Sequence, residues 1–481
     1  MRRLILLWIW GLSALSVAAQ ETPALPDYPA RYETPLSPAF TQSRRDAVRS
    51  KLPKNALAVI LSSPQRNRSN DTDFEYQPDR NLLYLTGSHE DASALLLAPS
   101  GMTVEGKTVK EILFVPARNP QYETWNGRRF GAARAMTELG VELALDNDQF
   151  QTVMNQLLDT GKYQIYHLPF PDGLEGADAN PQWRPFMTKT VPFLKEQFTK
   201  RSLTPNPNQL RGILNTLRGI KSPEELVLLQ KAIDISALAH QEAMRSCEPG
   251  MTEYQLEAVI EYVYQINGAA FPGYPSIVGS GENSTILHYN SNRRQIKNGE
   301  VVLVDAAAEY QGYTADITRT FPANGKFSPE QKAIYELALR AQDAAIAKAV
   351  TGVSMNQTTV AAHEVIAEGL MQLGILKERN QFRRFTLHGV SHHIGLDVHD
   401  WGEYKLAEGM VITVEPGIYI TPAADIDPKW WNIGVRIEDD ILITANGPKM
   451  LSGAAPRTVA EIESVMAEKG LGNLMNGKLK N

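Results

Sequence analysis

The 481-residue sequence contains a single cysteine, Cys247. One thiol cannot form an internal disulfide, so the fold has to rest on its hydrophobic core. We expect Cys247 to be a small buried apolar residue rather than a nucleophile. An excess of basic residues is also missing, because the formal net charge is -6. Without the basic patch or stripe typical of nucleic-acid-binding proteins, no nucleic-acid partner is expected.

Long apolar runs are confined to the amino terminus. Arg2 and Arg3 precede an apolar run over 4–15 and a small-residue Ser-Val-Ala-Ala exit, the pattern of a secretory signal peptide. The run is short for a membrane span and no stop-transfer flank follows, so we expect cleavage near Ala19 rather than an uncleaved anchor. Cleavage removes two arginines and no acids, giving a formal charge of -6 minus 2, or -8. The mature protein is then exported, periplasmic or secreted, without a stable membrane anchor.

The chain is too long for one ordinary core, and two domains are expected after the signal peptide at 1–19. Apolar β-rich runs alternate with helical patterns over 20–205, which predicts an α/β domain that opens with an extended proline-rich leader through Pro38. The expected strands are 56–63, 81–87, 92–99, 111–117 and 163–168, and the expected helices are 131–140 and 148–159. The segment SLTPNPN marks the boundary with a second domain over 206–467, and 468–481 is expected to be a flexible tail.

Two helices of the second domain have well-signalled starts. Ser222 is an N-cap residue, Pro223 occupies the first helical position and Glu225 completes a capping box. A second helix is expected to open at Thr252, with Gln255 in the capping-box position. The second domain is therefore expected to begin with a pair of helices.

The second domain also repeats itself weakly. The string NGEVVLVD, which ends at Asp305, matches EGMVITVE, which ends at Glu415, with a constant offset of 110. His288 and His399 differ by nearly the same offset, 111. Apolar strands recur by chance in sheets, but this repeat also matches carboxylates and histidines. We therefore predict an internal duplication with a two-fold pseudo-symmetric site between the halves.

Four carboxylates are expected to converge in this domain. Asp305 ends an apolar strand, where a buried carboxylate is costly unless it is paired or metal-bound. Asp316 follows eleven residues later, beyond a turn containing Gly312, so a hairpin would bring both aspartates to one place, and Glu415 and Glu438 repeat this arrangement. Four converging acids repel one another unless cations are present. With one imidazole they suit two divalent ions about 3.5 Å apart, and the carboxylate-rich set favours manganese or another first-row ion.

The imidazole is expected from the stretch RRFTLHGVSHHIGLDVHD at 383–400. It holds four of the nine histidines of the chain, together with Asp397 and Asp400. A histidine in a glycine-rich turn is usually a solvated or hydrogen-bonded loop residue, so the cluster alone does not identify a ligand.

The strings VDAAAEYQGYTADITRTFP, HGVSHHIGLDVHD, TVEPGIYI and GVRIED resemble the successive metal-site motifs of the pita-bread metallopeptidases. They are most similar to those of the aminopeptidase P group, whose members remove an N-terminal residue that precedes proline. Upstream, NLLYLTG and LFVPARNPQYETWNGRRFG resemble the amino-terminal domain of that group. The similarity covers about residues 45–465. It implies an α/β fold of two domains: an N-terminal α/β creatinase-like domain and a C-terminal pita-bread domain of duplicated α+β structure.

The resemblance also implies roles for individual residues. It implies metal ligands at Asp305, Asp316, His392, Glu415 and Glu438, with Asp316 and Glu438 bridging two divalent ions, expected to be Mn2+. His288, His388 and His399 match substrate-side histidines of the family, and Arg436 matches an arginine beside the second glutamate. His393 lies outside the ligand pattern and is expected to line or support the pocket. The three alanines after Asp305 are expected to change the shape of the pocket.

The implied reaction is attack on the scissile carbonyl by a hydroxide that bridges the two ions. Glu415 would relay the proton to the leaving proline nitrogen, and His399 or His288 would help one metal to stabilise the oxyanion. The substrates would be peptides with proline in the second position, and a homo-oligomer is expected.

Three alternatives remain open at the level of sequence. A prolidase, restricted to Xaa-Pro dipeptides, shares every metal motif. A creatinase-type hydrolase uses the same scaffold without metals and would not need all five ligand positions. A non-catalytic peptide-binding protein on this scaffold would be expected to lose ligands, whereas the chain keeps all five.

Overall fold

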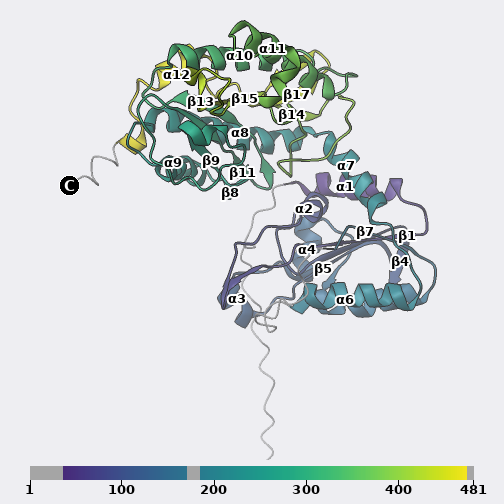
Figure 1. Cartoon of the computed structure of the whole chain (residues 1–481). Helices are drawn as coiled ribbons and strands as arrows, with labels where there is room; N and C mark the ends of the chain where they lie inside the picture. The colour runs from purple at the N-terminus through teal and green to yellow at the C-terminus, as the bar shows by residue number, and fades with distance from the viewer. Residues whose placement is uncertain (1–35, 171–184, 474–481) are drawn as a thin grey trace, which may run out of the picture.

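The computed structural model describes residues 36–170 and 185–473, which form the two bodies seen in Figure 1. The expected signal peptide at 1–19 lies outside these residues, as do the leader through residue 35 and the end of the expected tail, 474–481. Pro38 does not continue an extended leader, because it is the first residue of helix α1, which Ser37 caps. Across the described part of the chain, no helix has the length and apolar character needed to cross a membrane.

A mixed five-stranded sheet, in the order β6-β5-β4-β1-β7, forms the centre of the first body. Its strands are β1 (Ala56–Leu61), β4 (Ala94–Val104), β5 (Lys107–Val115), β6 (Ala144–Asp146) and β7 (Gln164–His167), and a separate hairpin is formed by β2 (Asn67–Ser69) and β3 (Thr72–Asp73). The helices are α1 (Pro38–Lys51), α2 (Arg80–Thr86), α3 (Pro120–Asn126), α4 (Gly131–Leu139), α5 (Phe150–Asp159) and α6 (Pro185–Lys200), with the 3-10 turn η1 (Asn147–Gln149). Side chains alternate across a strand, so Leu57 and Val59 pack towards α5 and α6, and Ala58 and Ile60 pack towards α1, α2 and α4. Helices therefore cover both faces of the sheet, as Figure 1 shows.

The prediction of a strand at 81–87 is wrong, because these residues lie in helix α2 and its C-cap. Asp79 caps the helix by accepting a hydrogen bond from Leu82 N at 2.8 Å, and Gly87 ends it with a φ of 72°. The helix is buried from Leu82 to Thr86, and a short run that is apolar on every side shows no helical period in sequence. Helix α2 lies against the second body, where Arg80 contacts Glu309.

The second body surrounds its strands with helices, and its first helix, α7 (Pro207–Gly219), packs against α1 and β7 of the first body (Figure 1). The other helices are α8 (Pro223–Ser246), α9 (Glu253–Ile266), α10 (Pro329–Ile346), α11 (Asn356–Gln372) and α12 (Val459–Val465), with 3-10 turns η2 (Gly281–Thr285), η3 (Arg379–Arg384) and η4 (Pro428–Trp430). The strands are β8 (Phe271–Pro272), β9 (Ile277–Ser280), β10 (Val301–Asp305), β11 (Ala308–Tyr310), β12 (Tyr313–Thr314), β13 (Thr318–Pro322), β14 (Val411–Val414), β15 (Gly417–Ile420), β16 (Ile433–Arg436), β17 (Asp439–Thr444) and β18 (Gly447–Met450). The capping boxes predicted at Ser222 and Thr252 are confirmed. Cys247 is buried beside α8, as expected, and burial raises the pKa of its thiol to about 12.

The predicted repeat is confirmed in the pairing of the strands. β10 pairs antiparallel with β13 outside a short inner hairpin of β11 and β12, and β14 pairs antiparallel with β17 outside an inner hairpin of β15 and β16. Each outer pair follows two helices, α8 and α9 in the first half and α10 and α11 in the second. The glycine turns repeat as well, because Gly250 N donates to Ile296 O and Gly352 N donates to Leu406 O, both at 2.8 Å.

Strand register shows which residues of the two halves are equivalent. Val304 lies opposite Arg319, and Val414 lies opposite Asp439. Val304 and Val414 are 110 residues apart in the repeat, so Arg319 and Asp439, which are 120 apart, are equivalent positions. By the same register Glu438 is equivalent to Thr318, not to Asp316 as the sequence motifs suggested. The two halves share a backbone frame but place their second acid differently within it.

Candidate metal centre and substrate cavity

A cavity of about 620 Å³ opens between the two halves, at the ends of β10 and β14. It is lined by all nine of the site residues predicted from the sequence: Asp305, Asp316, His392, Glu415, Glu438, His288, His388, His399 and Arg436. Alternation along β10 explains the orientation of the first of them. Val302 and Val304 enter the helix-covered core, while Leu303 packs with Ile277 on the cavity side. Asp305 has the parity of Leu303 and therefore faces the cavity.

The first half brings its two aspartates together by the predicted hairpin. Gln311 and Gly312 form its turn with φ values of 48° and 89°, a left-handed pair that suits a two-residue hairpin loop. Asp316 thereby reaches the end of β10. The Tyr274 hydroxyl lies 2.6 Å from Oδ1 of both Asp305 and Asp316. One hydroxyl proton can serve only one of these two oxygens, so the pair carries more negative charge than Tyr274 can satisfy.

The second half supplies the two glutamates from the ends of paired strands. Glu415 follows β14 and Glu438 precedes β17, so both lie at the same end of this pair. Glu438 Oε2 accepts a 2.7 Å hydrogen bond from the Thr318 hydroxyl, and Glu438 N donates to Thr318 O at 3.0 Å. These bonds join equivalent positions of the two halves, so the acids of both halves converge at the junction.

His392 reaches the acids from a segment that runs beside β14. His392 O accepts from Thr413 N at 2.9 Å, which places the segment as β9 is placed beside β10 in the first half. The Nδ1 atom of His392 lies 3.0 Å from His393 O, to which it donates. Its other nitrogen, Nε2, then presents a lone pair 3.5 Å from Asp316 Oδ2 and 3.5 Å from Glu415 Oε1. Burial, with a further contribution from His399, lowers the pKa of His392 to about 4, so the ring is neutral at neutral pH.

These groups fit metal ions and do not fit one another without them. Burial and the charge of Asp305 raise the pKa of Asp316 well above its usual range. Burial and the neighbouring acids also raise the pKa values of Glu415 and Glu438. An imidazole lone pair facing carboxylate oxygens is repulsive unless a cation lies between them. Oxygen and imidazole nitrogen are the ligands that first-row divalent ions accept, and donor atoms of Asp316, His392 and Glu438 lie within 4.8 Å of one another.

Arg436 connects the acids to a chain of polar side chains. Its guanidinium pairs with Asp305 Oδ2, and its Nη1 donates to the Tyr419 hydroxyl at 2.9 Å. Tyr419 donates in turn to His388 Nε2 at 2.7 Å, since His388 Nδ1 donates to Gly389 O at 2.7 Å. Burial and the charge of Arg436 lower the pKa of His388 to about 4. His388 is thereby held as a neutral ring whose Nδ1 lies 3.5 Å from Glu415 Oε2.

The remaining predicted histidines also line the cavity. His288 follows η2 beside Leu287 and Asn290, and His399 belongs to the 394–400 loop. The His399 ring packs on that of His392, with 4.2 Å between the ring centroids. These two histidines are therefore placed to contact a ligand, while only His392 among the four in the 383–400 stretch faces the carboxylates of both halves.

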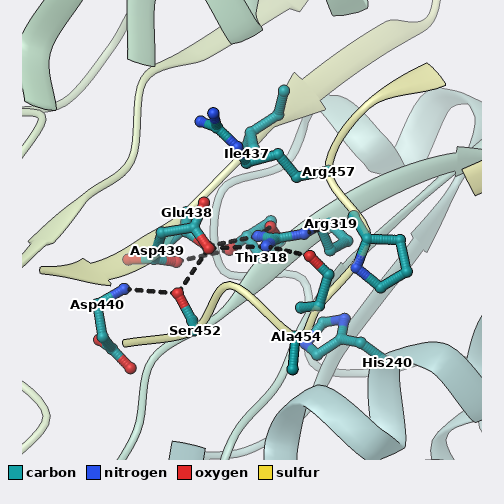
Figure 2. Close-up of polar contacts among 12 residues, drawn as sticks. His240, Thr318, Arg319, Ile437, Glu438, Asp439, Asp440, Ser452, Ala454 and Arg457 are labelled. Carbon is teal, nitrogen blue, oxygen red and sulfur yellow. Dashed lines mark hydrogen bonds and ion pairs between the residues drawn. The ribbon is translucent and has the colours of Figure 1, made fainter. Parts of the chain in front are cut away.

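Beneath the carboxylates, a buried polar network joins the two halves (Figure 2). Arg319 pairs with Asp439 at 2.7 Å, and both side chains are fully buried. Arg319 Nη1 also donates to Glu438 O at 2.6 Å, which fixes the backbone that carries this acid. Asp439 accepts two further bonds, from Ser452 Oγ at 2.6 Å and from Gln342 Nε2 at 2.8 Å. A buried ion pair with its other hydrogen bonds satisfied specifies one arrangement of the junction.

The structure corrects the expectation for the three alanines and decides between the two roles expected of His393. The alanines Ala306, Ala307 and Ala308 are fully buried and do not line the cavity, so they do not shape it directly. His393 also lies outside the cavity lining. It is buried beneath the loop with its Nε2 3.1 Å from Glu403 O, and Gly402 leaves room for its ring. It therefore supports the loop rather than the pocket surface.

Sequence reasoning missed three residues that contact the acids or their partners. Tyr419 and Thr318 had a signal, because strand alternation places Tyr419 on the face of Glu415 and Thr318 on the face of Asp316. Tyr274 had none. It lies in an irregular segment between β8 and β9, and only the folded chain brings it to the aspartates.

Comparison with known proteins agrees with this geometry. Residues 227–445 match the family described as Metallopeptidase family M24, and residues 41–166 match the Aminopeptidase P, N-terminal domain. The Xaa-Pro aminopeptidases of Haemophilus influenzae and Escherichia coli are 38% and 37% identical to this chain. Both similarities extend over 88% of this chain, and over 96% and 97% of those proteins respectively.

Solved structures show the same relationship in three dimensions. A structure of Escherichia coli aminopeptidase P superposes with a TM-score of 0.80 at 35% identity and covers 90% of this chain and 98% of that one. The structure of Pseudomonas aeruginosa aminopeptidase PepP gives a TM-score of 0.81 at 36% identity, with 90% and 99% covered. Both domains are included in these superpositions. The chain belongs to metallopeptidase family M24 and, within it, to the aminopeptidase P group.

Proposed function

We propose that this protein is an Xaa-Pro aminopeptidase that hydrolyses the bond between the first residue of a peptide and a proline in the second position. The observation that carries the proposal is the convergence of four carboxylates and the neutral ring of His392 on one cavity. Relatives with this activity in their names match the chain over 88% of its length. A structure of the Escherichia coli enzyme is titled as holding the inhibitor Pro-Leu, a dipeptide that begins with proline.

Two divalent ions complete the site in this proposal, and we propose manganese. Asp305, Asp316, His392, Glu415 and Glu438 would hold them. When bound, such ions supply Lewis acidity and lower the pKa of a water molecule to near neutrality.

The side chains of the protein divide the remaining tasks. We assign proton transfer to Glu415, because its carboxylate lines the cavity 3.5 Å from both His388 Nδ1 and His392 Nε2, where it can accept a proton and return it to the leaving proline nitrogen. Arg436 and Tyr419 hold His388 in one tautomer beside Glu415. His288 and His399, which both line the cavity, contact the peptide backbone and donate to the developing oxyanion. Proline provides no N–H to the site, so selection relies on the fit of its ring to the apolar wall.

An assay with peptides of two lengths tests the proposal against its nearest alternative. Purified protein with added manganese is expected to release the first residue from Xaa-Pro-Xaa tripeptides and longer peptides. Hydrolysis of Xaa-Pro dipeptides alone would establish a prolidase. Peptide binding without hydrolysis at any metal concentration would favour the non-catalytic peptide-binding protein.

We also propose that the protein is exported and forms a homo-oligomer. Export is supported by the basic, apolar and small-residue pattern of residues 1–19. Edman sequencing of the mature protein is expected to start near Gln20, and a start at Met1 would contradict cleavage. Light scattering after size exclusion is expected to give a multiple of the chain mass, and a monomer would contradict the oligomer.

A further inference from the structure

The loop at 394–400 carries His399 into the cavity, and backbone bonds to other strands hold its start, where Ile394 N donates to Val411 O at 3.2 Å and Thr314 N donates to Gly395 O at 2.9 Å. One backbone bridge joins its end to His393, where Asp400 N donates to His393 O at 2.9 Å. A second bond closes the loop on itself, from Gly395 N to Asp397 O at 3.2 Å. Asp397 and Asp400 flank His399 on either side. The position of the His399 ring therefore depends on what holds these two aspartates.

Arg218, in the last turn of α7, holds both of them. Its Nη2 donates to Asp397 Oδ2 and lies 2.8 Å from Asp400 Oδ1. Its Nη1 donates to Asn81 Oδ1 at 3.0 Å. The Arg218 and Asp400 side chains are 3% and 1% exposed, so the bond between them is shielded from water, whereas Asp397 reaches the surface. Burial opposes the charged form, but Asp400 and Asp397 outweigh it and raise the pKa of Arg218, which stays a cation.

A second cation and a close approach fix the same aspartate. Lys221 Nζ lies 3.7 Å from Asp400 Oδ2, and both side chains are buried. A Cβ atom at Gly395 would lie 2.5 Å from Asp400 Oδ2 and 2.8 Å from Lys221 Cε. Only glycine leaves Asp400 in this place. The loop is thus packed around its ion pairs, with no room for another arrangement of the carboxylate.

Arg218 also contacts the first domain through Asn81. Asn81 lies on α2, the short helix that was expected as a strand. The same helix makes a second contact with the second domain, because Arg80 Nη1 donates to Glu309 Oε1 at 3.1 Å. Tyr84 of α2 donates to Leu217 O at 3.2 Å, beside Arg218. Arg218 therefore joins α2, α7 and the His399 loop at one buried point.

We propose that Arg218 is a positioning residue, which holds the 394–400 loop against α2 of the first domain so that His399 faces the substrate. The inference rests on the proposed function and deepens it. Arg218 contacts none of the proposed metal ligands and does not line the cavity, so it acts only through the loop. Displacing a reacting or binding group by about 1 Å can cost about 10²-fold in rate.

A double-mutant cycle in the full-length, metal-loaded protein tests the proposal. Arg218→Met is expected to lower kcat/KM for an Xaa-Pro-Xaa peptide about 10- to 100-fold while the metal content is unchanged. Combined with His399→Ala, it is expected to cost less than about 2-fold more than His399→Ala alone, because both changes remove the same interaction. Arg80→Met is the matched control. It breaks the other contact of α2, and its effect is expected to multiply with that of His399→Ala.

Amide hydrogen exchange supplies a readout that does not need activity. Arg218→Met is expected to speed exchange over 394–400, whereas Arg80→Met leaves this loop unchanged. If Arg218→Met fails to fold, Asp397→Asn serves instead, because this side chain is 44% exposed, and the expected loss is about 3- to 10-fold. Unchanged exchange over 394–400, or multiplicative losses of Arg218→Met and His399→Ala, would overturn the inference. If the wild-type protein hydrolyses no Xaa-Pro peptide but Arg218→Met still speeds exchange over 394–400, the positioning role is supported and the proposed function is refuted.

Discussion

The two halves of the second domain use one backbone frame for different chemistry. At their junction Arg319 of the first half pairs with Asp439 of the second, and strand register makes these two residues equivalent. In a contact with true two-fold symmetry, a residue near the axis faces its own copy, so two arginines or two aspartates would repel one another. The opposite charges stabilise the junction because the halves belong to one chain and have different sequences.

The same divergence gives the two halves different polar groups around their acids. The first half gives two aspartates and joins its inner strands by the two-residue turn at Gln311–Gly312. The second half gives two glutamates and, at the position equivalent to Asp316, places Arg436. A cation there neutralises Asp305 and begins the chain through Tyr419 to His388. In the proposed reaction, both halves contribute acids, and Arg436, Tyr419 and His388 of the second half orient the groups around the proton carrier Glu415.

Glu415→Gln is expected to have the largest effect on activity. It keeps the shape of the side chain and removes the proposed proton carrier, so kcat is expected to fall about 10²- to 10⁴-fold while the protein stays folded. Glu408→Gln, at an exposed position in the same half, is the matched control and is expected to leave kcat unchanged. Single-turnover kinetics measure both. Full activity of Glu415→Gln, or of His392→Ala, would refute the assignment of the site.

Arg319→Met breaks the junction itself. It leaves Asp439 buried without its cation, and the free energy of unfolding is expected to fall by about 3 to 5 kcal/mol. Arg384→Met provides a control, because the pair between Arg384 and Asp425 is exposed and contributes little to stability. Urea denaturation compares the two variants. Equal losses would show that the buried pair does not stabilise the junction.

Tyr274→Phe tests the contribution of the first half to metal binding. Its hydroxyl contacts both aspartates, and loss of such a partner typically lowers metal affinity or activity by about 10- to 100-fold. Titration of the apoprotein with Mn2+ is expected to give weaker binding by this factor. Tyr254→Phe, on the exposed face of α9, should bind the metal as the wild type does.

His240→Gln makes the first half resemble the second and has the smallest expected effect. His240 donates to Ala306 O at 2.9 Å. The equivalent glycines Gly250 and Gly352 are 102 positions apart, and the same offset makes Gln342 the equivalent of His240. Burial and then Arg319 lower the pKa of His240 to about 4. The unfolded chain therefore binds the proton more tightly, and the stability contributed by neutral His240 is complete above about pH 6.5 and lost as the pH falls towards 4.

From about pH 7 to about pH 5, this histidine accounts for a loss of about 2 kcal/mol. His240→Gln is expected to reduce the pH dependence of the unfolding free energy by this amount, since the other titrating groups are common to both proteins. Denaturation at the two pH values measures the difference. An identical pH dependence in wild type and variant would show that His240 is not held neutral in the fold.

Local patterns explain why most of the site was predictable from the sequence. Asp305 and Asp316 belong to one hairpin, and the capping boxes at Ser222 and Thr252 involve residues three positions apart, so short-range rules reach them. The repeat gave Glu415 for the same reason. The sequence repeat matched Glu438 with Asp316, and this match was wrong. Only strand register reveals that the residue equivalent to Glu438 in the first half is Thr318.

Other features depend on tertiary structure and had no local signal. The α2 segment reads equally well as strand or helix, because it is apolar on all sides. Tyr274 contacts Asp316 from 42 residues away, and Arg218 meets Asp397 across 179 residues. Residue pattern alone could not separate the four histidines at 383–400. The family resemblance selected His392, and in the structure this ring lies 3.5 Å from acids of both halves.

In the proposed site, the acids of the two halves together hold two divalent ions. Burial and the neighbouring acids raise the pKa values of Asp316, Glu415 and Glu438, so without metal the stability these groups contribute falls as the pH rises above their unfolded values. Metal analysis of the purified protein tests the claim most directly. Two ions per chain are expected, lost together with activity on chelation and regained together on adding manganese. One ion or none in the fully active protein would contradict the account.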